Sequence, residues 1–323
     1  MHRLLRIASL CVLLGATAPL AASAQDYPNR TIRVIVTTAP GGISDVFLRS
    51  ITDQLHQRLG QPVIVENRPG GNMIIGARAC AEAAPDGYTL CVMPGEPLTY
   101  NQFQFKAIPY DPEASFAPIT NFFFLTQALG VTATLPAKNL DELAKLSKDK
   151  PGTLSYSAPS SSLIVFMEKW KQQTGADLVR VPFKGGGDTV TNMLNNTTPI
   201  GFLGVGNLLS NIRAGTIRPL LVEGDKRSPL IPEVPSLSEI NFHGDHTRAF
   251  FGLLAPAGTP RPIIDKVRGH ILEIVKEPGF MQRNLIDRGL EPVFNTPEEF
   301  DAYLKADRPR AQRIVEASGL GQR

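Results

Sequence analysis

The stretch that decides the fold is Ile32-Arg33-Val34-Ile35-Val36-Thr37-Thr38-Ala39-Pro40-Gly41-Gly42-Ile43-Ser44-Asp45. Its β-branched apolar start predicts a buried strand. The glycine pair predicts a tight turn, and apolar residues at helical spacing over 44–59 predict a helix after it. A strand that turns directly into a helix is the repeating unit of α/β sheets. The sequence therefore predicts an α/β fold.

The same alternation continues beyond this stretch. Apolar runs at 63–65 and 88–93 predict two more strands, and 74–83 predicts a helix that stops before Pro85-Asp86-Gly87. These strands are unbroken rather than alternating in hydrophobicity, which is typical of strands covered on both faces. We therefore expect a parallel, doubly wound α/β sheet.

A second series of alternating elements begins near residue 126. Strands are predicted at 153–157, 178–181, 200–203 and 218–222, and helices at 140–147, 163–174, 188–195 and 208–214. A strand at 250–255 and helices at 262–276, 280–287 and 297–317 complete the chain. At ~150 residues per domain, a chain of this length predicts two domains.

The first 24 residues have the features of a cleavable export signal. Arg3 and Arg6 precede an apolar segment at 7–14, and Ala22-Ser23-Ala24 has the small-x-small form of a cleavage site. The apolar segment is well short of the ~20 residues that span a bilayer, so a retained anchor is the lesser alternative. We expect cleavage after Ala24 and a periplasmic protein.

Charge and cysteine content narrow the function classes. Without Arg3 and Arg6 the chain has 31 basic and 30 acidic side chains, which is too balanced for a dedicated nucleic-acid binder. Cys80 and Cys91 either form a disulfide, which an oxidising compartment would preserve, or pack as two buried thiols. The scattered histidines and the absence of C-x-x-C predict no metal site.

Three junctions between a strand and a helix are candidate ligand loops, because open α/β sheets bind ligands beyond the carboxyl ends of their strands. The first holds Pro40, Gly41, Gly42, Ser44 and Asp45, the second Ser157, Ser160, Ser161 and Ser162, and the third Lys184, Gly185, Gly186 and Asp188. Unpaired amides at a helix start attract anions. Alternatively, the glycines only make turns and the serines or Asp45 only cap helices.

Motifs of common enzyme classes are missing from the sequence. No Walker A motif, complete dinucleotide fingerprint, G-x-S-x-G or H-E-x-x-H occurs. We therefore expect no catalytic residue and no cofactor. An exported hydrolase or transferase with Ser161 as nucleophile remains the alternative, because catalytic triads assemble in space rather than in sequence.

Short motifs over nearly the whole mature chain occur in the order of one known family. They are Tyr27-Pro28, Ile32 to Val36, Ala39-Pro40-Gly41-Gly42, Leu59-Gly60-Gln61-Pro62-Val63, Glu66-Asn67-Arg68-Pro69-Gly70, Ala84-Pro85-Asp86-Gly87-Tyr88-Thr89-Leu90, Pro109-Tyr110-Asp111-Pro112, Phe116-Ala117-Pro118, Val181-Pro182-Phe183-Lys184-Gly185-Gly186, Lys226-Arg227-Ser228-Pro229 and Phe251 to Pro260. The sequence thereby resembles the periplasmic solute-binding proteins of the tripartite tricarboxylate transporter family, also called the Bug family.

The resemblance implies two doubly wound α/β domains with an interdomain cleft, like a type II periplasmic binding protein. Residues 25–125 plus 248–323 would form domain 1, and residues 126–247 domain 2, because the chain crosses between them twice. The cleft would close on a small carboxylate held by loops 40–45 and 157–162. The protein would act as a monomer and deliver its ligand to membrane permease subunits, although a sensor that reports to a signalling partner has the same features.

The sequence departs from the family pattern at several positions. Met93-Pro94-Gly95-Glu96-Pro97 replaces a segment rich in Thr and Gly, and the region 199–203 lacks the usual Asp residues. Glu96 either faces the cleft, where it would select a ligand with an ammonium group, or is a solvated loop carboxylate, which is the interpretation we prefer. The identity of the carboxylate does not follow from the resemblance.

Overall fold

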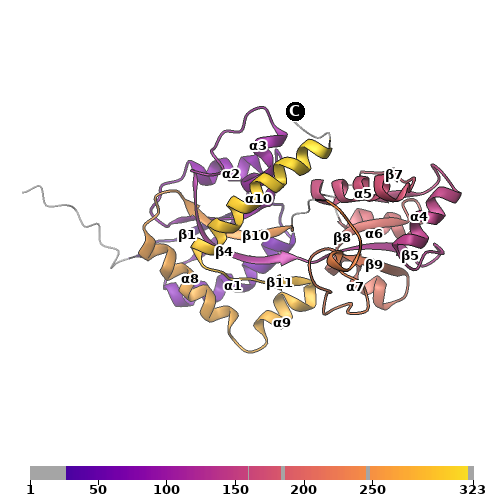
Figure 1. Cartoon of the computed structure of the whole chain (residues 1–323). Coiled ribbons are helices and arrows are strands. Elements are labelled where there is room, and N and C mark those ends of the chain that lie inside the picture. Colours follow the sequence, from indigo (N-terminus) through magenta and orange to yellow (C-terminus); the bar gives the residue numbers. More distant parts are fainter. Residues whose placement is uncertain (1–26, 159, 183–185, 245–247, 319–323) are drawn as a thin grey trace, which may run out of the picture.

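Strand β1 (Ile32–Val36) pairs in parallel with β2 (Val63–Asn67) on one side and β3 (Thr89–Pro94) on the other. The structure is a computed structural model that describes residues 27–158, 160–182, 186–244 and 248–318 (Figure 1). Val34, Ile35 and Val36 are at most 2% exposed, as expected for a strand covered on both faces. The predicted parallel pairing of these three strands is confirmed. The proposed export signal lies outside the described residues.

The other half of this sheet is antiparallel. Its strand order is β11-β4-β10-β3-β1-β2, and β10 (Phe250–Pro256) runs antiparallel to both β3 and β4 (Phe116–Leu125). Strand β11 (Leu290–Pro292) pairs antiparallel with β4 at the edge. The prediction of parallel strands covered β1, β2 and β3 only, and the antiparallel half lies outside it, because an unbroken apolar strand indicates burial on both faces and not strand direction.

A second sheet has the order β7-β6-β8-β5-β9. Strand β6 (Ser155–Ser157) is parallel to β7 (Val179–Arg180) and to β8 (Ile200–Gly204). Strand β5 (Gln127–Thr132) runs antiparallel to β8 and to β9 (Ile217–Val222). Figure 1 shows the two sheets as the centres of two lobes, which we call the first and second lobe.

Helices cover both faces of the first sheet. Val34 and Val36 lie in one apolar cluster with residues of α1 (Ile43–Leu59) and α8 (Arg261–Val275). Ile35 points the other way, into a cluster with residues of α2 (Ile74–Ala81) and α10 (Pro297–Ser318). This alternation follows from the two-residue period of a strand. The α/β fold that the sequence predicts is confirmed.

The second sheet is covered in the same way. Leu129 and Val131 of β5 pack with residues of α4 (Leu140–Asp149) and α5 (Ser161–Thr174), whereas Ala128 packs with residues of α6 (Gly186–Leu194) and α7 (Val205–Arg213). The helices of this lobe lie within a few residues of their predicted bounds. The sequence did not predict strands β4, β5 and β11, and it missed or merged several short helical segments.

The short segments differ from expectation where Pro and Gly crowd the sequence. The predicted helix 280–287 is α9 (Phe280–Asn284) followed by the 3-10 helix η4 (Ile286–Arg288). A π-helix, η2 (Glu96–Tyr100), and α3 (Asn101–Gln104) replace an expected loop. A further 3-10 helix, η3 (Leu237–Glu239), follows β9. No described helix is long and apolar enough to span a bilayer.

The chain crosses between the lobes at two places. Strand β4 ends at Leu125 and β5 begins at Gln127, so only Thr126 separates them. The return path runs from β9 to β10. We propose that residues 25–125 plus 248–323 and residues 126–247 form the two domains, which assigns every strand of one sheet to one domain.

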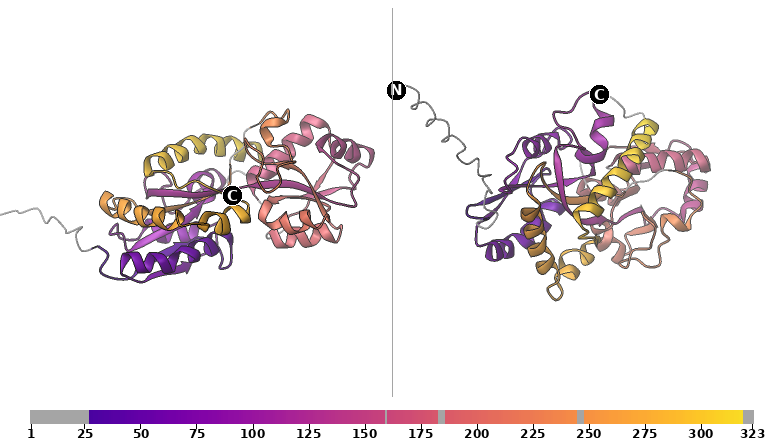
Figure 2. Two further views of the ribbon diagram at one scale, coloured as in Figure 1. Left: turned by 90° about the horizontal axis from the view of Figure 1, so that it is seen from below. Right: turned by 60° about the vertical axis from the view of Figure 1, so that its left-hand side comes forward.

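The C-terminal helix joins the lobes on one side. Helix α10 starts over the first sheet, and its later residues Ala311, Ile314 and Val315 pack with Val165 of α5 and Tyr100 of η2. Figures 1 and 2 show α10 extending from the first lobe to α5. The two lobes therefore share apolar contact in addition to the crossing segments.

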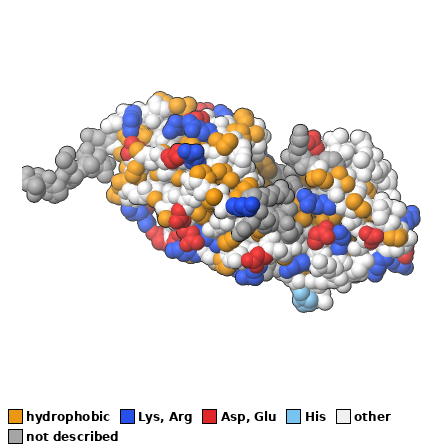
Figure 3. Space-filling model, turned by 90° about the horizontal axis from the view of Figure 1, so that it is seen from above, with side chains coloured by type: hydrophobic (Ala, Val, Ile, Leu, Met, Phe, Trp, Pro, Cys, Tyr) orange, Lys and Arg blue, Asp and Glu red, His pale blue; other side chains and the backbone are white. Residues whose placement is uncertain are grey.

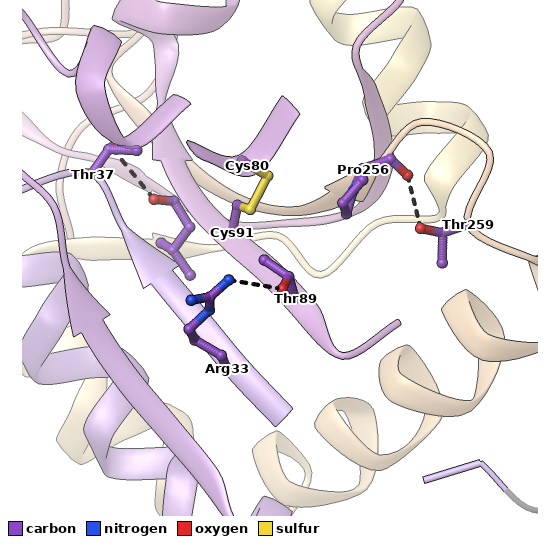
Figure 4. The surroundings of a disulfide bond; sticks show 8 residues. Arg33, Thr37, Cys80, Thr89, Cys91, Pro256 and Thr259 are labelled. Atoms are coloured by element: carbon purple, nitrogen blue, oxygen red, sulfur yellow. Dashed lines mark hydrogen bonds between the residues drawn. A yellow bond between two sulfur atoms is a disulfide. The ribbon is translucent and has the colours of Figure 1, made fainter. Parts of the chain in front are cut away.

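A disulfide joins Cys80 of α2 to Cys91 of β3, with their Cα atoms 6.2 Å apart. Both side chains are fully buried in the cluster between the first sheet and α10. Figure 4 shows the bond between helix and strand, beside the Arg33 to Thr89 hydrogen bond. Of the two alternatives that the sequence left open, the structure contains the disulfide.

We expect the double substitution Cys80→Ala/Cys91→Ala to lower the free energy of unfolding by roughly 3 kcal/mol, because the bond restricts a short loop in the unfolded chain. Denaturant unfolding at neutral pH measures this. Wild-type protein unfolded in the presence of a reductant is the control and should show a similar loss. An unchanged transition midpoint in the double variant would contradict a stabilising role for the disulfide.

Candidate functional site

The two sheets turn their carboxyl-terminal strand ends toward each other. Strands β1 and β3 end at Val36 and Pro94 on the edge where β4 leaves for the second lobe. In the second lobe β6 and β8 end at Ser157 and Gly204, on the edge where β5 enters. Open α/β sheets bind ligands at such edges, so the space between the lobes is the first place to look for a site.

A cavity of about 210 Å³ lies between these edges. Its walls come from both lobes and from both crossing segments. The residues that line it are Met73, Pro94, Gly95, Glu96, Tyr100, Leu125, Gln127, Ser160, Ser162, Arg248, Ala249, Phe250 and Phe251. On the face shown in Figure 3 acidic and basic side chains are interspersed over both lobes.

The wall from the first lobe is built on the π-helix. The hydroxyl of Thr99 donates to the carbonyl of Gly95 across 3.1 Å, which closes the turn after β3. The loop before α2 is tied to the same wall, because Asn72 and Asn101 exchange two hydrogen bonds of 2.6 and 2.9 Å. These bonds fix the position of Met73 and of Glu96. Single-turn π-helices occur frequently at functional sites.

Glu96 is half-buried and lines the cavity, so its interpretation as a solvated loop carboxylate is wrong. Burial raises the pKa of its carboxyl group, and a hydrogen bond from its own backbone amide opposes that rise. No ion pair of Glu96 is found among the described residues. The first lobe thus presents a carboxyl group without a cationic partner.

The wall from the second lobe carries hydroxyl groups at the start of α5. Ser160 is the N-cap residue, but its side chain makes no capping hydrogen bond. Its Oγ lies 3.2 Å from Oγ of Ser162, and both residues line the cavity. Capping therefore does not account for these serines. The first-turn amides of α5 lack intrahelical acceptors, and together with the helix dipole they favour an anion here.

The floor of the cavity is formed by the crossing segments. Gln127 donates to the carboxylate of Glu223 across 2.8 Å, and both side chains are buried. Burial raises the pKa of Glu223 to about 7, against the lowering effects of the Gln127 hydrogen bond and the charge of Arg248. Arg248 itself pairs with Glu291 at 2.5 Å and lies 4.2 Å over the ring of Phe124.

A second hollow of about 380 Å³ lies beyond this floor. Glu223, Asp225 and Lys226 line it, and Arg248 lines both spaces. It is the larger of the two. We nevertheless propose the smaller cavity as the candidate ligand site, because of the two it alone holds the start of a helix whose serine hydroxyl at the N-cap makes no capping bond.

The loop 40–45 is braced by its own side chains. Asp45 is buried, and it accepts the amide of Gly41 at 2.9 Å and the guanidinium of Arg49 at 3.1 Å. Ser44 is also buried, with its Oγ 2.9 Å from Oγ1 of Thr38. Burial raises the pKa of Asp45, but the hydrogen bonds from Arg49, Gly41 and Asn67 outweigh it and hold the pKa below its usual value.

Pro40, Gly41 and Gly42 lie on the surface at the end of β1 and do not line the described cavity. The amide of Gly42 points to the carbonyl of Ala39, and that of Gly41 to Asp45. Two of the amides expected to meet an anion are therefore already used. Contact between this loop and a ligand stays a prediction.

The remaining residues predicted for the ligand site do not line the cavity or lie outside the described part of the chain. Ser157 is buried at the end of β6, with its Oγ 3.4 Å from Oγ1 of Thr189 in α6. Asp188 is exposed in the first turn of α6, which begins at Gly186. Gly185 and the side chain of Ser161 lie outside the described part of the chain, so the alternative of a Ser161 nucleophile is untested.

Sequence reasoning missed most of the residues that line the cavity, among them Met73, Tyr100, Gln127 and Arg248. Gln127 and Arg248 stand within two residues of the predicted domain boundaries at 125/126 and 247/248. Because a chain that crosses between lobes must pass the cleft, these boundaries were the signal that identifies them. The positions of Met73 and Tyr100 at the cavity depend on local turns that no sequence pattern predicted.

A model of the family described as "Tripartite tricarboxylate transporter family receptor" (TctC) matches residues 47–320 of the chain. The protein belongs to this family. Similar proteins include BugT of Bordetella pertussis, which is 31% identical over 324 residues, with 99% of this chain and 98% of BugT covered. The resemblance seen in the sequence is thereby confirmed.

Two solved structures extend the comparison to this TctC receptor's fold. "R. palustris Rpa4515 with adipate" has a TM-score of 0.80 at 25% identity and covers 92% of this chain and 100% of its own. "MatC (Rpa3494) from Rhodopseudomonas palustris with bound malate" has a TM-score of 0.75 at 26% identity, covering 90% and 100%. Among the described residues of this receptor, no group of three or more His, Cys, Asp or Glu side chains gathers as a metal site.

We expect Asp45→Asn to lower the free energy of unfolding by ~1–2 kcal/mol, because the carboxylate accepts charge-assisted hydrogen bonds. Since its pKa is lowered in the folded state, this stability is present above the usual Asp value and is lost as pH falls through the folded value. The variant should therefore lose less stability on acidification. Asp53→Asn, an exposed position of the same helix, is the control, and equal acid profiles for both variants would refute the bracing role.

Glu223→Gln should remove a component of the pH dependence of stability. The pKa of Glu223 is about 7 in the folded state and near 4.5 in the unfolded state. The contribution of its carboxyl group to folding stability is therefore complete below pH 4.5 and is lost as pH rises through 7. At ~1.4 kcal/mol per pKa unit the loss has an upper limit of ~3 kcal/mol. The variant keeps an amide oxygen that accepts the Gln127 hydrogen bond.

Urea unfolding of wild type and Glu223→Gln between pH 4.5 and 8 measures this difference. The variant should gain stability relative to wild type as pH rises. Glu233→Gln, an exposed glutamate of the same connecting segment, should follow the wild-type curve. Parallel curves for wild type and Glu223→Gln would show that the buried carboxyl does not titrate in this range.

Proposed function

We propose that this TctC receptor binds a small carboxylate in the cavity between its lobes and delivers it to a membrane permease. The observation that carries the proposal is the pair of hydroxyls on Ser160 and Ser162. They stand at the start of α5, face the cavity, and are not used to cap the helix. A helix start with free donors is suited to an anionic group.

The relatives support a carboxylate as the ligand class. One of the two similar structures is described with adipate and the other with bound malate, and both ligands are small carboxylates. A cavity of about 210 Å³ is below the ~300 Å³ of pockets for drug-sized ligands and suits a metabolite of this size. These points support the class and leave the particular acid open.

Binding energy would come from several modest terms. A helix start contributes ~0.3–1 kcal/mol to a nearby anion at exposed sites and up to ~2 kcal/mol when partly buried. Each neutral hydrogen bond adds ~0.5–1.5 kcal/mol. Arg248 lines the cavity, but its charge is already shared with Glu291. Such a sum holds an anion reversibly, which suits capture followed by release.

Closure of the lobes would accompany binding. The cavity walls come from different lobes, so a ligand contacts both only when they approach. Thr126 is the single residue between β4 and β5, and such short segments at element ends are typical hinges. We propose that binding shifts the receptor toward a closed state in this way.

Location and partners follow from the family and the sequence. A receptor of a tripartite transporter works with membrane components, and residues 1–24 have the features of an export signal. We propose a monomeric, periplasmic, non-catalytic protein whose ligand serves transport. A sensing role shares every feature described here and differs only in the partner that reads the closed state.

We expect di- or tricarboxylates, amino acids or aromatic acids to raise the melting temperature of the mature protein, by an amount that follows RT ln(1 + [L]/Kd). Thermal denaturation with a panel of such acids measures this. Ser162→Ala should weaken binding of the best acid about 2- to 13-fold, the loss of one hydrogen bond.

Ser155→Ala is the matched control, because the Ser155 hydroxyl donates to the carbonyl of Thr197 away from the cavity. It should bind like wild type. A panel without any shift would refute carboxylate capture. Turnover of any bound acid or its ester would favour the hydrolase alternative instead.

A further inference from the structure

The cavity combines two chemically different ends. Ser160 and Ser162 of the second lobe offer hydrogen-bond donors, whereas Glu96 of the first lobe offers only a carboxyl group. We propose that the ligand is a small aminocarboxylate, whose carboxylate meets the start of α5 and whose ammonium group meets Glu96. This inference rests on the proposed function and narrows it to one substrate class.

The charge of Glu96 is not matched within the cavity. Arg248 is the one cationic side chain among the described residues that line it. The Arg248 guanidinium pairs with Glu291 and stacks over Phe124, and Glu291 belongs to the hollow on the other side of the floor. Glu96 therefore lacks the counter-ion that a half-buried carboxylate normally has.

A second carboxyl group stands behind Glu96. Asp307 of α10 is 1% exposed, and neither of its carboxylate oxygens has a hydrogen-bond partner among the described residues. The neighbouring Thr99 hydroxyl donates to the carbonyl of Gly95, and its polarity lowers the pKa of Asp307. Burial raises the pKa of Asp307 to about 6, and the charge of Glu96 adds to that rise.

The remaining charged and titratable groups around this pair compensate it only in part. Arg308 and Arg310 lower the pKa of Asp307, but no ion pair joins either to Asp307 or Glu96 among the described residues. The guanidinium of Arg308 donates to the carbonyls of Leu98 and Pro112. Tyr303 stays protonated, because burial and the charge of Asp307 raise its pKa. The wall is thus poised to accept a cation.

An unpaired carboxyl group at one end of the cavity distinguishes aminocarboxylates from dicarboxylates of equal length by the charge of their second end group. A dicarboxylate would bring its second negative charge to Glu96, where it either meets repulsion or requires Glu96 to take up a proton. An aminocarboxylate brings an ammonium group to the same place and restores the missing counter-ion. Because the two ends belong to different lobes, an aminocarboxylate also ties the lobes together in a way that a monocarboxylate does not.

The test uses matched ligand pairs that differ only in one end group. These pairs are 3-aminopropanoate with succinate, 4-aminobutanoate with glutarate, and 5-aminopentanoate with adipate. Isothermal titration of the mature protein at pH 7.5 should show at least tenfold tighter binding of the amino partner in the pair of best length. Repeating the titration in two buffers of different ionisation enthalpy should show proton uptake for the diacid only.

Substitutions at Glu96 and Asp307 test which residue causes the preference for the amino partner. Glu96→Gln should reduce the preference for the amino partner at least tenfold, and Asp307→Asn should reduce it by less. Glu82→Gln, an exposed glutamate at the end of α2, is the control and should bind like wild type. Circular dichroism verifies folding, and the wild-type preference decides the question even where a variant does not fold.

The outcomes separate this inference from the proposed function. Tighter binding of diacids by the wild type, with a ratio that Glu96→Gln does not change, overturns the aminocarboxylate assignment alone. Binding of neither class by the wild type overturns the proposed function and this inference with it. A tenfold amino preference that disappears in Glu96→Gln supports both.

Discussion

The hydrogen bond between Gln127 and Glu223 joins the start of β5 to the end of β9, beside the point where the chain enters the second lobe. Gln127 opens β5 just after the first crossing, and Glu223 follows β9 at the start of the connection that leads back to the first lobe. The backbone adds a second bond, from the amide of Glu223 to the carbonyl of Gln127. A buried polar pair is costly unless it is satisfied, so this contact fixes the end of β9 against the start of β5. Gln127 lines the cavity and the charge of Arg248 acts on Glu223, so the pair helps to form the cavity floor.

The two walls of the cavity differ in the charge that they favour in a ligand. The second lobe contributes a helix start, where first-turn amides lack intrahelical acceptors and two serine hydroxyls lie beside them. The first lobe contributes a π-helix, whose irregular backbone turns Glu96 inward instead of out to solvent. The first wall carries a carboxyl group and the second a helix start that favours negative charge. Under the proposal above, this difference would set the orientation of a ligand.

The sequence predicted what local periodicity determines. Strand β1 and helix α1 follow from the apolar pattern of 32–59, and the serines before α5 follow from their place at a strand-to-helix junction. The parallel direction of β1, β2 and β3 followed as well, but the antiparallel direction of β10 did not, because burial on both faces looks the same in parallel and antiparallel strands. Glu96 was misjudged for a related reason: proline and glycine on both sides are typical of a loop, and only tertiary contacts such as that of Asn72 with Asn101 convert the segment into a wall. Loop 40–45 shows the reverse case, since residues typical of an anion site are used by Asp45 for internal bracing.

Helix α10 has a consequence for how the two lobes can move. It is anchored over the first sheet through Phe300 and Leu304 and reaches Val165 of α5 with Ile314 and Val315. A rotation that pulled these side chains apart would expose apolar surface at a cost of ~25 cal/mol per Å². The least costly opening is therefore a rotation of the lobes that keeps the contact between α10 and α5 in place. The ligand would then enter and leave on the side of the molecule away from the C-terminal helix.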